Sequence, residues 1–164
     1  MRTGVRYLVT ICLALSSVGA LAADRSGFEG KWTIDPQSTG DEPVPVNLVQ
    51  EIRQKGPNLE IQSKFAEPAG GVVPLLYVGI LTNNLTLSTD GSVQQNQIGP
   101  FQQASKTTLD GTTMTTEWTA VIKGDDVNGK WIRTLDPDGK HMTLEIHESS
   151  KGQDHQAMLK FRRM

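Results

Sequence analysis

Much of the chain after residue 28 alternates apolar and polar residues with a period of two, which is typical of strands that bury one face. The first such segment, 28–34, places Phe28, Trp32 and Ile34 on one face and charged or hydroxyl side chains on the other. The pattern recurs at 46–53, 59–65, 113–122, 142–147 and 157–161. Helical periodicity is nearly absent, so the chain is predicted to be all-β.

Glycine-containing turn signals separate these segments at about the spacing of hairpins. They are Gly56-Pro57, Asp90-Gly91, Asp110-Gly111, Asn128-Gly129, Asp138-Gly139 and Lys151-Gly152. Glycine supplies the positive φ that tight hairpin turns require. Because short links join segments that are neighbours in sequence, the pattern favours a single antiparallel up-and-down barrel of about eight to ten strands over a Greek-key sandwich.

Two stretches depart from the alternation. Residues 70–82, GGVVPLLYVGILT, are apolar on both faces, and Pro74 argues against a central strand at that point. We expect either a strand covered by a loop, or a rim segment that covers a cavity or joins two copies in a weak dimer. Residues 92–106 are rich in amides and fit either a strand–turn–strand unit with inward glutamines or a solvated loop.

The N-terminus has the composition of a secretory signal peptide. Arg2 and Arg6 precede a mostly apolar run over 7–18, and the Ala-Leu-Ala at 20–22 supplies small residues before a cleavage site. The apolar run is shorter than the roughly 18 residues that a membrane span needs, so we expect cleavage after residue 22 and no membrane anchor. The domain then comprises residues 23–164 and is predicted to be periplasmic or secreted.

Cysteine usage and charge narrow the classes of function. The single cysteine, Cys12, lies in the predicted signal, so the mature domain has no disulfide and no thiol ligand for a metal. It carries 14 basic and 18 acidic residues, a net charge of about −4, which is no footprint for nucleic acid or an anionic membrane. A chain of this size buries roughly two-thirds of its surface on folding, so one domain held by its own core, without a cofactor, is expected.

The two ends of the domain predict how the barrel closes. Trp32 lies on the apolar face of the first strand, and Phe161 and Arg163 share a face of the last strand. These two strands pair in a closed barrel. Arg163 is then expected to lie over the indole of Trp32 in a cation–π contact. We therefore assign barrel closure to Gly30, Trp32, Phe161 and Arg163.

These features resemble a known group of proteins. The segment GKWTIDPQST, 30–39, is similar to the opening G-x-W-x-L-D-P-x-K-S of small exported lipocalin-like proteins of bacteria. The segment LDPDGKHMTL, 135–144, resembles their late hairpin, and the Phe-Arg-Arg at 161–163 resembles their common Phe-x-Arg ending. The resemblance implies a bacterial lipocalin-like, calycin-type barrel that takes a small apolar ligand. Many members of this group have no assigned activity.

Arg133 is the principal candidate for a ligand anchor. It alternates in phase with Trp131 and Leu135, so it faces inward if they do. A buried arginine needs a partner, and its planar guanidinium suits the carboxylate of a fatty acid or a similar amphiphile. If Ile132 is the inward residue instead, Arg133 lies in water. The predicted lining of the interior is Arg133, Trp131, Trp118, Met114, Met142 and Tyr77.

The histidines give little support to metal binding or catalysis. The register that keeps the apolar faces of the last hairpin inward sets His147 outside and His155 inside, opposite Glu148. We therefore expect no histidine metal site. His155 and Glu148 form an ionisable pair at one barrel mouth, where hairpin-end residues are usually solvated, and a general acid–base role needs a pocket and a tuned pKa. The sequence holds no nucleophile elbow or complete calcium loop, so no catalytic residue is assigned.

Three functions remain open at this point. The first is an exported barrel that binds one hydrophobic or amphiphilic, lipid-like molecule, since a barrel of about eight strands has room for a small ligand. The second is a non-catalytic envelope protein with a packed interior that acts through protein–protein contacts. The third, a hydrolase or isomerase built on the barrel, has the least support from the residues.

Overall fold

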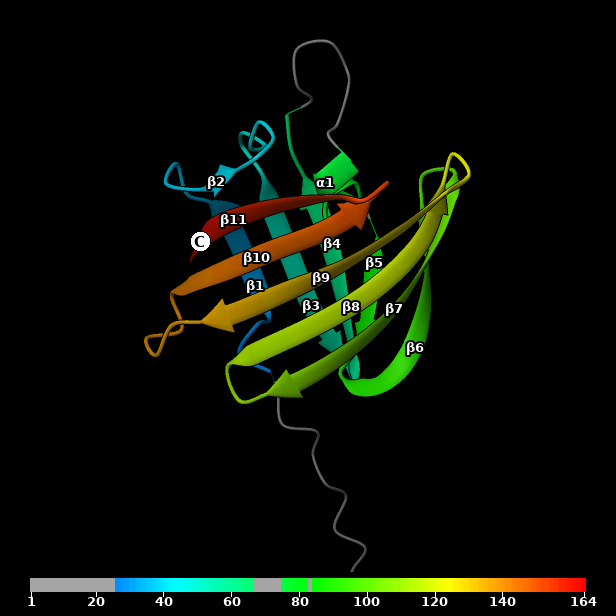
Figure 1. The fold of residues 1–164 in the computed structure, drawn as a ribbon. Helices are drawn as coiled ribbons and strands as arrows, with labels where there is room; N and C mark the ends of the chain where they lie inside the picture. Colours follow the sequence, from blue (N-terminus) through cyan, green and yellow to red (C-terminus); the bar gives the residue numbers. More distant parts are fainter. Residues whose placement is uncertain (1–25, 67–74, 83) are drawn as a thin grey trace, which may run out of the picture.

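The fold is one antiparallel sheet curled into a nearly closed up-and-down barrel (Figure 1). The computed structural model describes residues 26–66, 75–82 and 84–164. Within these residues the elements are β1 (Gly30–Ile34), β2 (Thr39–Gly40), β3 (Val49–Lys55), β4 (Asn58–Lys64), α1 (Leu75–Val78), β5 (Leu85–Ser88), β6 (Asp90–Ile98), β7 (Phe101–Asp110), β8 (Thr113–Ile122), β9 (Asp125–Leu135), β10 (His141–Ser150) and β11 (Gln153–Arg163). The predicted fold class is confirmed. The predicted signal peptide, 1–22, lies outside the described residues.

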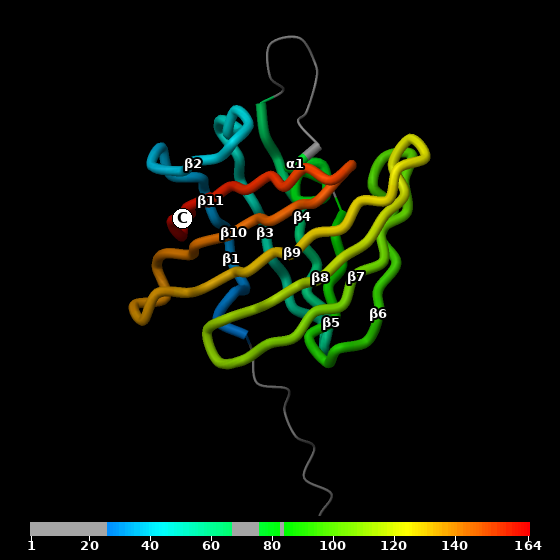
Figure 2. Tube along the Cα trace, viewed as in Figure 1, coloured from blue at the N-terminus to red at the C-terminus, as the bar shows by residue number. Residues whose placement is uncertain are grey.

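Strand order follows the chain almost without exception. The order is β5-β4-β3-β1-β11-β10-β9-β8-β7-β6, and the short β2 lies off this path against β11. Figure 2 shows the chain passing from each strand to its neighbour around the wall. The long-range pairing of β1 with β11 joins the two ends of the domain. No helix within the described residues has the length and hydropathy to cross a membrane.

The predicted closure at one end of the barrel is confirmed. Trp32 and Arg163 are direct cross-strand partners, and the guanidinium carbon of Arg163 lies 4.4 Å from the centroid of the indole. The Arg163 guanidinium also donates hydrogen bonds to the carbonyl oxygens of Gly27, Glu29 and Gly139. The indole N–H donates to the carbonyl of Phe28 at 2.8 Å. We call this the closed end.

Gly30 explains the spacing of the Gly-x-Trp motif. Its φ is +140°, which L side chains rarely adopt, and a β-carbon there would lie 2.8 Å from Arg163 Nη1. Any larger residue would therefore push away the guanidinium that covers Trp32. Phe161 is buried beside this cluster, as predicted, and pairs with Ile34.

The seam of the barrel lies between β5 and β6, where the described residues form no backbone ladder. The side chain of Asn96 bridges it: its Oδ1 accepts from the Thr86 N–H at 2.8 Å, and its Nδ2 donates to the Thr86 carbonyl at 3.0 Å. The same Nδ2 lies 3.3 Å from Ser105 Oγ. The Asn96 side-chain amide thus makes the two hydrogen bonds that a peptide group of a neighbouring strand would make with Thr86, so part of the backbone at this strand edge is hydrogen-bonded.

The structure shows the conformation of the described residues in both stretches that depart from the alternation. Residues 92–106 form the strand–turn–strand alternative, β6 and β7, with Asn96 and Gln103 buried. The strand alternative for 70–82 is wrong: 75–78 is the helix α1. The described apolar side chains Leu76, Tyr77, Ile80 and Leu81 are buried in the barrel core, so they are not offered to a second copy. Residues 70–74 lie outside the described residues.

The prediction of a turn at Asn128-Gly129 is also wrong. Both residues lie within β9, and the turn between β8 and β9 is at Lys123 and Gly124, which have positive φ. Gly129 serves packing instead: a β-carbon there would lie 2.5 Å from atoms of the Trp118 indole. The absent side chain makes room for the tryptophan on the neighbouring strand.

Candidate functional site

The interior is organised in layers along β9, whose inward residues run from the closed end to the open end. Leu135 lies at the closed end, followed by Arg133, Trp131, Gly129 and Val127. The open end, which we call the mouth, is formed by α1 and by the turns at 123–124 and 151–152. Figure 1 shows α1 at this end of the barrel.

Arg133 is inward, as the alternation with Trp131 and Leu135 predicts, and it is fully buried. None of its three guanidinium nitrogens has a hydrogen-bond partner among the described residues. The guanidinium carbon lies 5.9 Å from the centroid of the Trp131 ring, in a cation–π contact. Burial lowers the pKa of Arg133 from 12.5 to about 10, so the group stays charged at neutral pH. A buried positive charge without a counter-ion is the outstanding electrostatic feature of the interior.

Trp131 and Trp118 form an aromatic layer above Arg133. Their ring centroids are 5.5 Å apart with an interplanar angle of 41°, and both indole N–H groups are buried without a hydrogen-bond partner among the residues that the structure describes. Trp131 also packs against Gly79, where a β-carbon would lie 2.6 Å from the ring. Trp118 covers Gly129 and reaches towards the mouth. This layer separates Arg133 from the mouth.

The short segment around α1 fills the space between the aromatic layer and the mouth. The carbonyl of Ile80 accepts hydrogen bonds from Gln50 Nε2 at 3.1 Å and from Ser63 Oγ at 2.7 Å. Tyr77, a predicted lining residue, is buried, and its hydroxyl donates to the Glu42 carbonyl at 3.0 Å. Burial, followed by the nearby carboxylates of Glu42 and Asp41, raises the pKa of Tyr77 to about 12. These contacts hold α1 as an internal plug.

The two predicted methionines lie towards the closed end. Met114 is the cross-strand partner of Arg133, and Met142 is the partner of Leu135. Both side chains are buried in the core. The structure therefore brings Arg133, Trp131, Trp118 and Met114 into neighbouring layers, and it sets Met142 and Tyr77 below and above them.

The interior holds further buried polar groups, of which the sequence reasoning did not single out Gln50. Three residues each have one buried side-chain oxygen without a hydrogen-bond partner in the described part of the chain: Gln50, Gln103 and Glu148. The alternation does place Gln50 in phase with Leu48 and Ile52, and this was the available signal. Together with the indole and guanidinium donors, these acceptors leave the interior with unsatisfied hydrogen-bonding capacity of both kinds.

Glu148 corrects the expectation that the end of the last hairpin is solvated. The predicted register is confirmed, with Glu148 opposite His155 and His147 opposite Gln156. However, Glu148 is only 3% exposed. Burial raises the pKa of its carboxyl group, and the nearby His155 partly offsets that rise. Both residues line a cavity of about 470 Å³ at the mouth.

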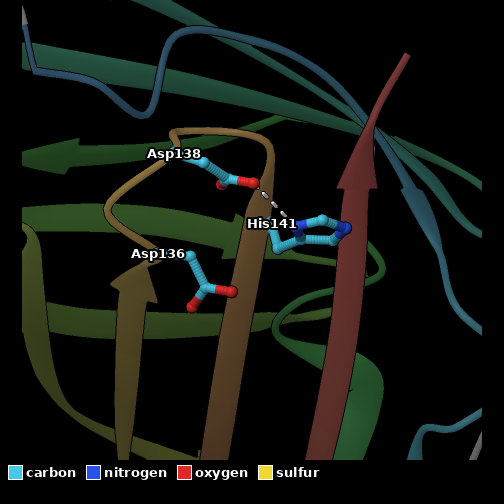
Figure 3. A group of neighbouring side chains, drawn as sticks. All are labelled: Asp136, Asp138 and His141. Carbon is cyan, nitrogen blue, oxygen red and sulfur yellow. Dashed lines mark ion pairs between the residues drawn. The ribbon is translucent and has the colours of Figure 1, made fainter.

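Three side chains in the turn between β9 and β10 lie close enough to suggest a metal centre. The ligand atoms of Asp136, Asp138 and His141 all lie within 4.8 Å of one another, and all three residues are exposed (Figure 3). The position of the Asp138 carboxylate is explained by its contacts within the turn. Its Oδ1 accepts a hydrogen bond from the Lys140 N–H at 2.7 Å, and its Oδ2 lies 3.4 Å from His141 Nδ1. The Lys140 N–H, followed by the charge of His141, lowers the pKa of Asp138. An exposed turn of this kind is no evidence for a bound ion.

Comparison with known proteins places the fold but no family. No protein-family model matches the sequence, and no curated protein matches it. Among solved structures, a secretory abundant heat soluble protein from Ramazzottius varieornatus is similar with a TM-score of 0.55, 12% identity, and coverage of 87% of this chain and 98% of that one.

Two further similar structures hold ligands. Zebrafish ileal bile acid-binding protein in complex with cholic acid has a TM-score of 0.51, 13% identity and coverage of 85% of this chain and 100% of that one. A Schistosoma mansoni fatty acid binding protein in complex with arachidonic acid has a TM-score of 0.51, 13% identity and coverage of 85% and 97%. At these identities the likeness concerns the fold alone: this chain is an antiparallel up-and-down β-barrel with a fold similar to that of these proteins.

Proposed function

We propose that this protein is an exported binding protein that holds one lipid-like amphiphile inside the barrel, with the acidic group of that molecule on Arg133. The observation that carries the proposal is the buried guanidinium without a partner. A carboxylate supplies two acceptor oxygens in the planar geometry that a guanidinium fork matches. The ligand thus provides the counter-ion that the described residues do not.

The surroundings of Arg133 suit the apolar part of such a molecule. The neighbouring layers are Met114 and Leu144 on the adjacent strands and the two indoles above. An apolar lining with one convergent polar anchor is the usual composition of a small-molecule site. The unpartnered indole N–H of Trp131 offers one more donor to the same acidic group.

Access to Arg133 is from the mouth and requires α1 to move. Gly79 packs on Trp131, and the segment from Leu76 to Leu81 fills the path. Because α1 has only four residues, its own helical hydrogen bonding contributes little to its stability. The bonds from Gln50 and Ser63 to Ile80 are therefore the contacts that ligand binding must replace.

The fold comparison supports the same ligand class. The similar zebrafish and Schistosoma barrels are complexes with cholic acid and arachidonic acid, and both of these ligands are carboxylic acids. Export rests on the sequence of residues 1–22 alone. N-terminal sequencing of the protein recovered outside the cytoplasm should begin at Ala23.

Isothermal titration of the delipidated protein with dodecanoate tests the proposal. Arg133→Met keeps an unbranched apolar stem but removes the charged guanidinium, and it should weaken dodecanoate binding at least about tenfold, as expected for a lost charge-assisted hydrogen bond. Arg53→Met, a change of the same type at an exposed strand position, serves as the control and should bind like the parent. Equal binding by Arg133→Met and the parent, or no binding by the parent, would overturn the proposal.

One observation favours a second candidate function, a packed barrel that acts through its outer surface. The α1 segment and the two tryptophans fill the middle of the interior. If this candidate holds, native mass spectrometry of the purified protein shows the bare chain mass, and dodecanoate gives no heat. A retained lipid mass that disappears in Arg133→Met supports the binding function instead.

A further inference from the structure

The cavity at the mouth is a second concave site, separate from the Arg133 layer. Its volume is about 470 Å³. The walls are apolar over much of their area, with Leu76 and Val78 from α1, Phe101 from β7, and Ile122 and Val127 beside the turn between β8 and β9. Glu148, Ser150 and His155 contribute polar groups on the side of β10 and β11. The aromatic layer of Trp118 and Trp131 lies between this cavity and Arg133.

The side chain of Glu148 is aimed into the barrel. On β10 it alternates in phase with Ile146, which is fully buried, and with Ser150, which lines the same cavity. His147 and Ser149 are out of phase and face the outer surface. Glu148 is 97% buried, and its Oε2 has no hydrogen-bond partner among the described residues. A buried carboxylate oxygen of Glu148 thus faces the mouth cavity without a hydrogen-bond donor among the described residues.

The basic groups around the mouth leave Glu148 unpaired. No ion pair within 4.0 Å joins it to any described cation. Lys151 is held by Asp125, with Nζ and Oδ2 2.9 Å apart. Lys123 is exposed on its turn, and His155 is partly exposed across the hairpin. Glu148 therefore needs a positive partner that the described residues do not supply.

The charges at the mouth favour a cationic occupant. Glu42, Asp125 and Glu148 line the cavity together with Lys123 and Lys151, so carboxylates outnumber ammonium groups. The carboxylates of Glu42 and Asp41 also help to raise the pKa of the nearby Tyr77, which reports the same negative field. A buried carboxylate beside the apolar part of a mixed cavity wall matches a molecule with an ammonium head and an alkyl chain.

We propose that the mouth cavity is a binding site for protonated aliphatic amines, with Glu148 as the counter-ion of the ammonium group and the apolar walls around the alkyl chain. The site differs from the acid-binding site at Arg133, because it uses other residues and the opposite charge. Ser150 lies in phase with Glu148 and supplies a hydroxyl acceptor on the same wall.

The test is titration with octylamine, octanol and octanoate at about pH 7.5, where the amine is protonated and an ordinary histidine is neutral. Octylamine should bind the parent at least about tenfold more tightly than octanol, and Glu148→Gln should remove that preference. Glu145→Gln on the outward face of the same strand is the matched control and should behave like the parent. Equal binding of octylamine and octanol by the parent, or an unchanged preference in Glu148→Gln, would refute the site.

Two further measurements distinguish binding at this site from binding at Arg133 and from an effect of misfolding. Arg133→Met should retain octylamine binding while it loses dodecanoate binding, and loss of both would show that one shared cavity is responsible, contradicting a second site. Carboxyl-carbon NMR of Glu148 in the intact parent should show a lower pKa when octylamine is bound, because the ammonium favours the charged form. An unchanged titration of Glu148 at saturating octylamine would also count against the proposal.

Discussion

Replacement of Arg133 by methionine in the ligand-free protein should stabilise the barrel. The change removes a fully buried charge whose guanidinium nitrogens have no partner among the described residues. Methionine places an unbranched, flexible apolar side chain at the same position, although it is shorter than arginine. An isolated buried charge is a cost to the folded state, so its removal should raise the free energy of unfolding.

The magnitude follows from the effect of burial on the guanidinium. Burial lowers the pKa of Arg133 from 12.5 to about 10. At about 1.4 kcal/mol per pKa unit, this shift corresponds to about 3 kcal/mol of unfavourable free energy for the charged form. Loss of the cation–π contact with Trp131, worth about 0.5–2 kcal/mol, opposes the gain. We therefore expect a net rise of about 1–3 kcal/mol in the free energy of unfolding.

The assay is urea unfolding of delipidated protein at neutral pH, followed by tryptophan fluorescence and by circular dichroism. Coincident transitions and an unchanged dependence on urea are needed before the midpoints are compared. Arg53→Met, at an exposed strand position, should change stability by no more than about 0.5 kcal/mol. A loss of stability in ligand-free Arg133→Met would show that Arg133 has an internal partner, and the argument for a ligand counter-ion would fail.

Three further changes probe the other features. Gly30→Ala should cost about 1–3 kcal/mol because the new β-carbon meets both positive φ and the Arg163 guanidinium, whereas Gly111→Ala, with positive φ but open space, should cost less in the same urea assay. Burial raises the pKa of Glu148, so folded wild type retains a proton that the unfolded chain releases above about its ordinary pKa of 4.5. The free energy of unfolding of the wild type therefore falls as the pH rises from about 4.5 to the raised pKa of Glu148 in the folded state. Glu148→Gln does not titrate there, so its stability relative to wild type should increase from acid to neutral pH. Parallel curves of stability against pH for the two proteins would contradict the burial argument. Asn96→Ala should cost about 1–3 kcal/mol and speed hydrogen exchange of the Thr86 amide, and unchanged exchange would show that the seam does not depend on this side chain.

The alternation of apolar and polar residues was sufficient to predict the strands that form the wall of the barrel. The period of two fixes which side chains face inward, and a slip by one residue would expose every apolar residue of a strand. For this reason the register of the last hairpin followed from the residues, whereas the alternation left two directions open for Arg133 and the structure shows the inward one. The contact of Trp32 with Arg163 was also predictable, because closing an up-and-down sheet leaves its terminal strands as partners.

What fills the interior was decided by tertiary structure. The segment 76–81 is apolar on both faces, and only the space inside the barrel determines that it packs there, with 75–78 as a helix. Likewise Asn128-Gly129 has the composition of a turn, but the indole of Trp118 on the next strand occupies the space above Gly129. Burial of Glu148 and the lack of partners for Arg133 depend on contacts from α1 and several strands at once. Sequence alternation determines the direction of a side chain, whereas its partners are set by distant segments that meet only when the barrel closes.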